Sequence, residues 1–185
     1  MAGDDRELAL RAQQGHADAH AELLHRHRRT VVTVVYAILG CRDEAEDVAQ
    51  ETFVKAYRAV RSYNPRYPYV AWLRRIAVNT AISRLRSRNR ARRRDEADLP
   101  AGHGQDPPLH EQVAAAELST HIRRAVDALP LRQRVAVSLF HLQEMSLADT
   151  AHAMGCSVGA VKSHLHRARE ALALRLSSHL KEARP

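Results

Sequence analysis

The stretch SLADTAHAMGCSVGAVKSHLHRAREAL, residues 146–172, decides the fold of the C-terminal part of the chain. Ser146 stands where it can cap the start of a helix, Gly155 permits a tight turn after that helix, and Ser157 can cap a second one. Ala151 supplies the small side chain needed where two such helices cross. This order of residues predicts a helix-turn-helix whose second helix is the recognition helix.

The second helix is expected to have one buried face and one polar face. Val161 and Leu165 are four residues apart, and Ala168 and Leu172 continue their line, so we expect this face to pack inward. The side chains left for solvent or DNA are Lys162, Ser163, His166, Arg167 and Arg169. A plain helical hairpin with a solvated basic face is the alternative interpretation of this segment.

The rest of the chain also has the composition and periodicity of helices. Its 185 residues are 45% hydrophobic but only 4% aromatic, which favours an all-α fold over strands. Apolar side chains recur at helical spacing from Leu8 to about Leu39. The β-branched run at 30–39 suits a strand locally. Because Gly40 follows it as a helix C-cap would and no partner strand is apparent, we expect a helix there.

Two further helices and an aromatic loop are expected between residues 43 and 94. The first helix begins acidic and ends basic. Its apolar face comprises Ala45, Val48, Phe53, Val54 and Tyr57. The proline-containing stretch SYNPRYP, residues 62–68, predicts a loop. A strongly basic helix then runs from about Tyr69, with Trp72 expected in the core.

The composition changes abruptly after this basic helix. Residues 84–94 hold seven arginines, whereas residues 95–117 hold six acidic residues, three prolines and two glycines but no lysine or arginine. A flexible acidic linker is therefore expected at 95–117. It would join two small helical domains at 1–94 and 118–185.

The overall charge indicates a polyanionic partner. The chain carries 29 Lys and Arg against 21 Asp and Glu, a formal net charge of +8, which favours nucleic acid through counterion release. It has no glycine-rich phosphate loop, nucleophile elbow or zinc-protease motif, so we expect no enzyme activity, cofactor or small-molecule substrate. The N-terminus does not resemble a signal peptide, and no apolar run approaches the ~20 residues of a membrane span. We expect a soluble cytoplasmic protein without direct membrane insertion.

Histidines and cysteines raise an alternative hypothesis of metal binding or redox sensing. His16 and His20 are four residues apart and two more histidines follow closely, but no cysteine or carboxylate completes an obvious tetrahedral set. Cys41 and Cys156 form no metal-ligand spacing or disulfide framework. We therefore predict no metal site and assign the histidines to solvated helix faces.

Three segments together resemble the extracytoplasmic-function sigma factors of the sigma-70 family. LPLRQRVAVSLFHLQEMSLADTAHAMGCSVGAVKSHLHRAREAL, residues 129–172, looks like their region 4. DEAEDVAQETFVKAY, residues 43–57, resembles the region 2 helix that docks on the polymerase clamp. YVAWLRRIAVNTA, residues 69–81, resembles their promoter-melting segment. The three segments follow the order of the family.

The resemblance implies a sigma factor that binds core RNA polymerase and directs it to particular promoters, with residues 1–94 as region 2 and residues 118–185 as region 4. The implied polymerase-binding residues are Asp47, Gln50, Glu51 and Phe53. The implied −10 DNA-binding residues are Tyr63, Tyr67, Arg74, Arg75, Asn79, Arg84 and Arg86. Of these, Asn79 would bind a flipped base. The implied −35 DNA-binding residues are Ser157, Lys162, Ser163, His166 and Arg167.

The resemblance also implies partners and regulation. The partners are core RNA polymerase, through its clamp helices and flap, and promoter DNA in double-stranded and melted form. An anti-sigma factor, frequently one held at the membrane, would keep such a protein inactive until a stress signal. A stand-alone transcription regulator is the alternative class, and it explains residues 118–175 but not residues 43–81.

Overall fold

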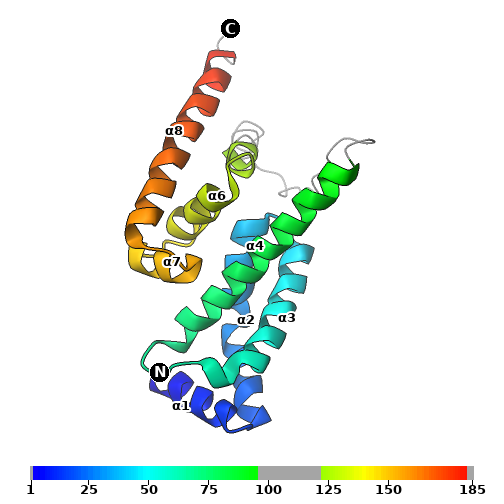
Figure 1. The fold of residues 1–185 in the computed structure, drawn as a ribbon, viewed down its shortest axis with the longest axis vertical. Helices are drawn as coiled ribbons and strands as arrows, with labels where there is room; N and C mark the ends of the chain where they lie inside the picture. The colour runs from blue at the N-terminus through cyan, green and yellow to red at the C-terminus, as the bar shows by residue number, and fades with distance from the viewer. Residues whose placement is uncertain (1, 96–121, 183–185) are drawn as a thin grey trace, which may run out of the picture.

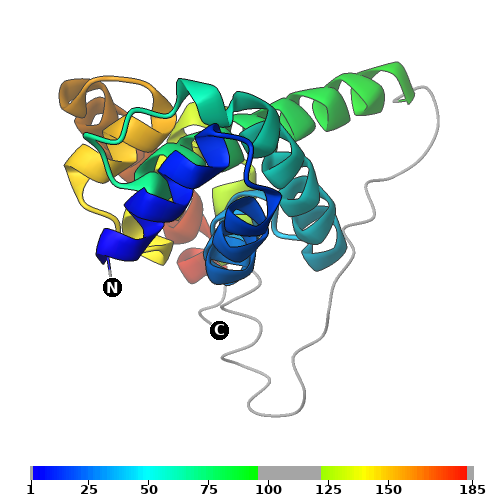
Figure 2. The same cartoon turned by 90° about the horizontal axis from the view of Figure 1, so that it is seen from below.

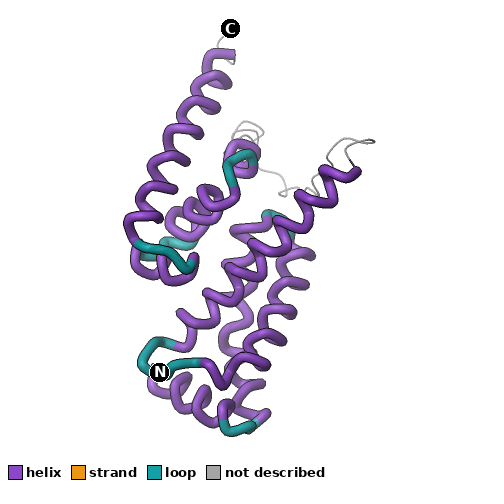
Figure 3. Tube along the Cα trace, viewed as in Figure 1, coloured by secondary structure: helices purple, strands orange, loops and turns teal. Residues whose placement is uncertain are grey.

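The computed structural model describes residues 2–95 and 122–182, and the side chains of residues 5–91 and 122–177. Every regular element in these ranges is helical and none is a strand (Figures 1 and 3). The predicted all-α fold is therefore confirmed for the described residues. Apart from its first residue, the linker predicted at 95–117 lies outside them.

The N-terminal helices pack as a bundle. They are α1 (Ala2–Gln13), α2 (Ala17–Leu39), α3 (Arg42–Ala59) and α4 (Tyr69–Asp95). The helices α2, α3 and α4 lie alongside one another, and α1 crosses their lower end in Figure 1. A short 3-10 turn, η1 (Val60–Ser62), and the loop at 63–68 lead from α3 into α4. This bundle positions the loop beside the start of the basic helix.

The β-branched run of the sequence is helical, as predicted. Val31 and Val34 belong to α2 and are buried. The helix ends at Gly40, whose φ of 76° lies in the left-handed region and whose N–H donates to the Tyr36 carbonyl at 2.8 Å. Burial of one apolar face against α3 and α4 thus outweighs the local preference for strand.

The C-terminal helices form the predicted helix-turn-helix. Residues 122–127 are helical, and α6 (Leu131–Val137), the π-helical turn η2 (Ser138–Leu142), α7 (Leu147–Met154) and α8 (Val158–Glu182) follow. Ser146 Oγ accepts the N–H of Asp149 at 3.0 Å, and Ser157 Oγ accepts the N–H of Ala160 at 3.2 Å. Gly155 makes the turn with a φ of 61°. The caps and the turn are where the sequence predicted them.

The two helical units pack directly against each other. Helix α7 contacts α4 and the turn η2 contacts α2 (Figures 1 and 2). One cluster of buried apolar side chains includes both Leu73 of α4 and Leu139 of η2. Arg134 of α6 is buried, and its Nε and Nη2 donate to the Ile38 carbonyl near the end of α2 at 3.1 and 2.5 Å. The two units therefore share a core in this arrangement.

Candidate nucleic-acid interface

The residues predicted to contact the −35 element all lie on the exposed side of α8 and of the turn before it. They are Ser157, Lys162, Ser163, His166 and Arg167. Val161 and Ala168 fix the orientation of the helix because both are fully buried. Neither Lys162 nor Arg167 forms an ion pair with a carboxylate in the described part of the chain. Both cations are available to guanine edges or to phosphates.

The other predicted −35 residues already make contacts within α8. Ser157 caps the helix, and Ser163 Oγ donates to the Gly159 carbonyl at 3.0 Å. The imidazole Nε2 of His166 lies 3.5 Å from the Glu170 carboxylate, one turn further along. His166 thus has an acidic neighbour on the surface predicted to approach DNA.

The residues predicted to contact the −10 element come from the loop at 63–68 and from α4. The exposed members are Tyr67, Arg75, Asn79 and Arg86, and the half-buried members are Arg74 and Arg84. The Arg84 guanidinium lies 3.8 Å from the Glu51 carboxylate, so that cation is partly neutralised. An exposed aromatic ring, an amide and cations on one helix and its preceding loop suit an unstacked, negatively charged strand.

Tyr63 is placed differently from its prediction as a DNA contact. Its side chain is 3% exposed, and its ring packs at 5.4 Å from that of Tyr69 and 5.6 Å from that of Trp72, centroid to centroid. Its hydroxyl donates to the Tyr67 carbonyl at 2.7 Å. Burial raises the pKa of the Tyr63 phenol, which stays neutral. Tyr63 therefore holds the loop from inside and offers no ring face to DNA in this structure.

Part of the −10 surface is covered by the second helical unit. The ring of Tyr67 stacks on that of His152 in α7, with centroids 6.2 Å apart. Arg74 lines a pocket of about 240 Å³ between the units, together with Arg29 of α2 and Gln143. Asn79 remains exposed. The basic helix is thus open at its middle and partly covered near its start.

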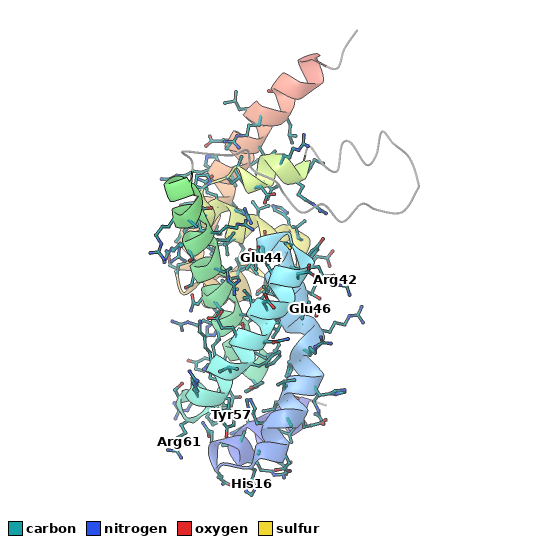
Figure 4. The ribbon with its side chains drawn as sticks, turned by 90° about the vertical axis from the view of Figure 1, so that its right-hand side faces the viewer. His16, Arg42, Glu44, Glu46, Tyr57 and Arg61 are labelled. Carbon is teal, nitrogen blue, oxygen red and sulfur yellow. The ribbon has the colours of Figure 1, made fainter. Side chains whose placement is uncertain are left out.

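A mainly apolar groove of about 350 Å³ lies between α2 and α3. Leu24 and Val32 of α2 face Phe53 and Val54 of α3 across it, and Gln50 also lines it. Figure 4 shows two further lining residues, Glu46 and Tyr57, on different turns of α3. Apolar walls with a polar rim are typical of protein-binding surfaces.

Two of the four residues predicted to bind polymerase line this groove, and the other two lie beside it on α3. Gln50 and Phe53 line the groove. Asp47 is exposed but does not line it. The Glu51 carboxylate lies 2.8 Å from Lys55 Nζ, one turn later in α3, and 3.8 Å from the Arg84 guanidinium of α4. Only the first two therefore belong to the apolar groove.

Tyr57 is a groove residue that we had not assigned to polymerase binding. Its side chain is 57% exposed, and its ring packs edge-on against the imidazole of His20 with centroids 4.8 Å apart. Burial lowers the pKa of His20, so the imidazole is neutral at physiological pH. Tyr57 stands four residues after Phe53 and seven after Gln50, a spacing that places the three on one helix face.

The histidines do not come together as a metal site in the described part of the chain. No group of three or more His, Cys, Asp or Glu side chains there could hold a metal ion. The assignment of the histidines to solvated helix faces is wrong for His20 and His27, which are each 9% exposed and pack against Tyr57 and Asp5 respectively. Cys41 and Cys156 are free thiols and half-buried. Within the described ranges, no helix is both long and apolar enough to span a bilayer.

Comparisons with known proteins identify both helical units. The model of sigma-70 region 2 matches residues 23–91, and the model of sigma-70 region 4 matches residues 120–172. RNA polymerase sigma-H factor of Pseudomonas aeruginosa is 32% identical, covering 97% of each chain. The extracytoplasmic-function sigma-E factor of Escherichia coli is 34% identical, covering 91% of this chain and 92% of the relative.

Two solved structures also resemble this chain over most of its length. CnrH in complex with the cytosolic domain of CnrY matches with a TM-score of 0.64 and 27% identity, over 95% of this chain and 98% of CnrH. The sigma factor RpoE in complex with the anti-sigma factor NepR, from Bartonella quintana, matches with a TM-score of 0.65 and 25% identity, over 85% and 96%. The chain therefore belongs to the sigma-70 family and, within it, to the extracytoplasmic-function sigma factors.

Proposed function

We propose that this sigma factor binds core RNA polymerase and directs promoter-specific initiation, reading the −35 element with α8 and melting the −10 element with α4 and its preceding loop. We further propose that region 2 spans residues 1–94 and region 4 spans residues 118–185. The observation that carries the proposal is the pair of exposed polar and basic surfaces, one on each matched region. The protein acts as an initiation factor and not as an enzyme.

The −10 surface has the groups needed to hold a melted strand. The Asn79 amide is exposed in the middle of α4 and offers both a donor and an acceptor to a base edge. Tyr67 provides a ring for stacking, and Arg75 and Arg86 lie on the same helix for phosphates. Tyr63 supports this surface from the core.

Core polymerase would dock on the groove between α2 and α3. Gln50, Phe53 and Tyr57 line it from α3, and we add Tyr57 to the predicted docking residues. Asp47 and Glu51 would contribute charge at the edges of the docking face. Burial of the apolar walls would provide most of the affinity, and the charges would favour the correct orientation.

Replacing Tyr57 by alanine is expected to weaken binding to core polymerase by about tenfold, because truncating an aromatic anchor at an interface costs about 1–2 kcal/mol. The measurement is titration of labelled protein with purified core enzyme, followed by fluorescence anisotropy. Tyr36→Ala is the matched control, because Tyr36 is also partly exposed and does not line the groove. Equal losses in the two variants would place the docking surface elsewhere.

An anti-sigma factor is the proposed negative regulator. CnrH and RpoE, which resemble this chain over both helical units, were solved with the cytosolic domain of CnrY and with the anti-sigma factor NepR. The groove between α2 and α3 and the partly exposed start of α4 are the surfaces that such a partner would cover. Its binding would compete with core polymerase.

Full access of a DNA strand to the −10 surface requires the two units to separate. The second unit covers one face of the Tyr67 ring, whose side chain is still 57% exposed, and encloses part of Arg74, so neither is fully open to a DNA strand in this arrangement. Core polymerase, which would bind both regions, supplies the separation that matches the two promoter elements. Free protein is therefore a poor promoter binder.

Run-off transcription with purified core polymerase tests the function on a promoter taken from upstream of the protein's own coding region. We expect a start-site-specific transcript that depends on this protein. In Asn79→Ala the amount of transcript is expected to fall by about ten- to a hundredfold, because losing a base contact costs about 1–3 kcal/mol. Asn89→Ala, an exposed asparagine on the same helix, is the control and should leave the transcript unchanged. No transcript, together with tight binding to promoter DNA without polymerase, would favour a stand-alone regulator.

A further inference from the structure

One side chain of helix α1 contacts the loop at 63–68, which carries Tyr67. The amide Nε2 of Gln13, in the last turn of α1, donates to the Val60 carbonyl at 3.0 Å and to the Tyr63 carbonyl at 2.7 Å. These carbonyls belong to the first residue of η1 and to the first residue after it. A single side-chain amide therefore joins both ends of the turn that leads out of α3.

The contact is transmitted to the exposed part of the loop. The backbone of Tyr63 accepts from Gln13, and the phenol of Tyr63 donates to the Tyr67 carbonyl at 2.7 Å. Between them, Asn64 Oδ1 accepts the N–H of Arg66 at 3.0 Å, which closes the loop locally. The position of the exposed Tyr67 ring thus depends on a short series of hydrogen bonds that begins in α1.

Helix α1 is itself anchored at its other end. The carboxylate of Asp5 lies 2.9 Å from His27 Nε2 and 3.3 Å from Arg26 Nη1, both in α2. The His27 ring lies 5.6 Å from that of Tyr69, the first residue of α4. Because these contacts fix the start of α1 to α2, the last turn of α1 has a defined position and can hold the loop at 63–68 in place.

We infer that Gln13 is a positioning residue for capture of the −10 strand, acting through Tyr63 on the loop that carries Tyr67. The inference rests on the proposed function of the −10 surface. Gln13 precedes residue 23, where the match to region 2 begins, so this role belongs to a part of the chain outside that match. Gln13 does not touch DNA; it sets the geometry of residues that do.

A pair of neighbouring glutamines makes a sharp test possible. In Gln13→Glu the donating amide is replaced by a carboxylate oxygen that would face two carbonyl oxygens, so both hydrogen bonds are lost. Gln14→Glu makes the same change of charge at an exposed side chain on the adjacent position. Gln13→Met keeps the length of the side chain without donors and without charge, and it is the second variant should Gln13→Glu fail to fold.

The measurement is the affinity of holoenzyme, assembled from full-length protein and core polymerase, for a single-stranded oligonucleotide of the non-template −10 strand. We expect about a tenfold or greater loss in Gln13→Glu and in Gln13→Met and none in Gln14→Glu, because a displaced loop misplaces its contacts. Affinity for core polymerase and for a −35 duplex is expected to stay unchanged, which separates positioning from general loss of structure.

Three outcomes have distinct meanings. A wild-type holoenzyme that does not bind the oligonucleotide overturns the proposed −10 function itself. Wild-type binding that is matched by a folded Gln13→Met protein within about twofold overturns the positioning role, because Gln13 would then serve stability alone. A loss for the −35 duplex as large as that for the −10 strand would overturn it as well.

Discussion

Leu139→Ala is expected to lower the free energy of unfolding by about 2–5 kcal/mol, the range for truncating a fully buried leucine. Leu139 is 0% exposed in the π-helical turn η2 and belongs to the apolar cluster shared by both helical units. The loss has two parts, the apolar surface no longer buried and the cavity that rigid neighbours leave unfilled. It is measured by urea denaturation followed by circular dichroism.

Leu142→Ala provides the control for this prediction. Leu142 lies in the same turn three residues later, and its side chain is 59% exposed. Its replacement is expected to change the unfolding free energy by less than about 0.5 kcal/mol. Equal destabilisation by the two substitutions would show that η2 does not point Leu139 into the core.

Arg167→Ala is expected to reduce the affinity of holoenzyme for a −35 duplex by about ten- to a hundredfold, or about 1–3 kcal/mol, and to relax sequence preference at one base pair. The reason is that Arg167 is exposed on α8 and unpaired with carboxylates of the described residues, so its guanidinium is free to take a guanine edge. Competition binding with single-base variants of the duplex, at one fixed salt concentration, measures both effects.

Arg123→Ala is the matched control, since Arg123 is exposed but lies outside the helix-turn-helix. It should leave the sequence preference intact. A uniform loss across all duplexes for Arg167→Ala, without change in preference, would assign Arg167 to a phosphate and not to a base.

The helix-turn-helix was predictable because its determinants are local. Ser146, Gly155 and Ser157 act on backbone groups a few residues away, and the structure shows the caps and the left-handed turn at those positions. Helix α2 was predictable for another reason, since Gly40 marks its end. The hydrophobic periodicity from Leu8 to Leu39 did not reveal that the helix is interrupted at Gly15, between α1 and α2, where φ is 96°.

The residues that the sequence placed less well depend on distant contacts. A helical wheel of α3 alone pairs Glu51 with Lys55 four residues later, but it cannot show the second cation, Arg84, which comes from α4. Tyr63 belongs to an aromatic loop, and only its packing on Tyr69 and Trp72 distinguishes an inward ring from an outward one. The contact of Glu51 with Arg84 and the inward direction of the Tyr63 ring both depend on packing between elements, which no local pattern reveals.

Arg134 is the clearest example of a role that the sequence did not reveal. It stands in a stretch of ordinary amphipathic helix, yet its guanidinium binds the Ile38 carbonyl, 96 residues away, and pairs with Asp127 at 3.0 Å. The Arg134 guanidinium lies at the C-terminal end of α2, where the helix dipole is negative and the last backbone carbonyls have no helical N–H as partner. Such a contact between two units cannot be inferred from either one alone.

The shared core gives the closed arrangement a temperature dependence of its own. Parting the units would transfer apolar side chains of α4, α7 and η2 into water, and hydration of such surface raises the heat capacity. Hydrophobic contacts weaken on cooling, so the balance between the closed and the parted forms shifts toward the parted form at low temperature.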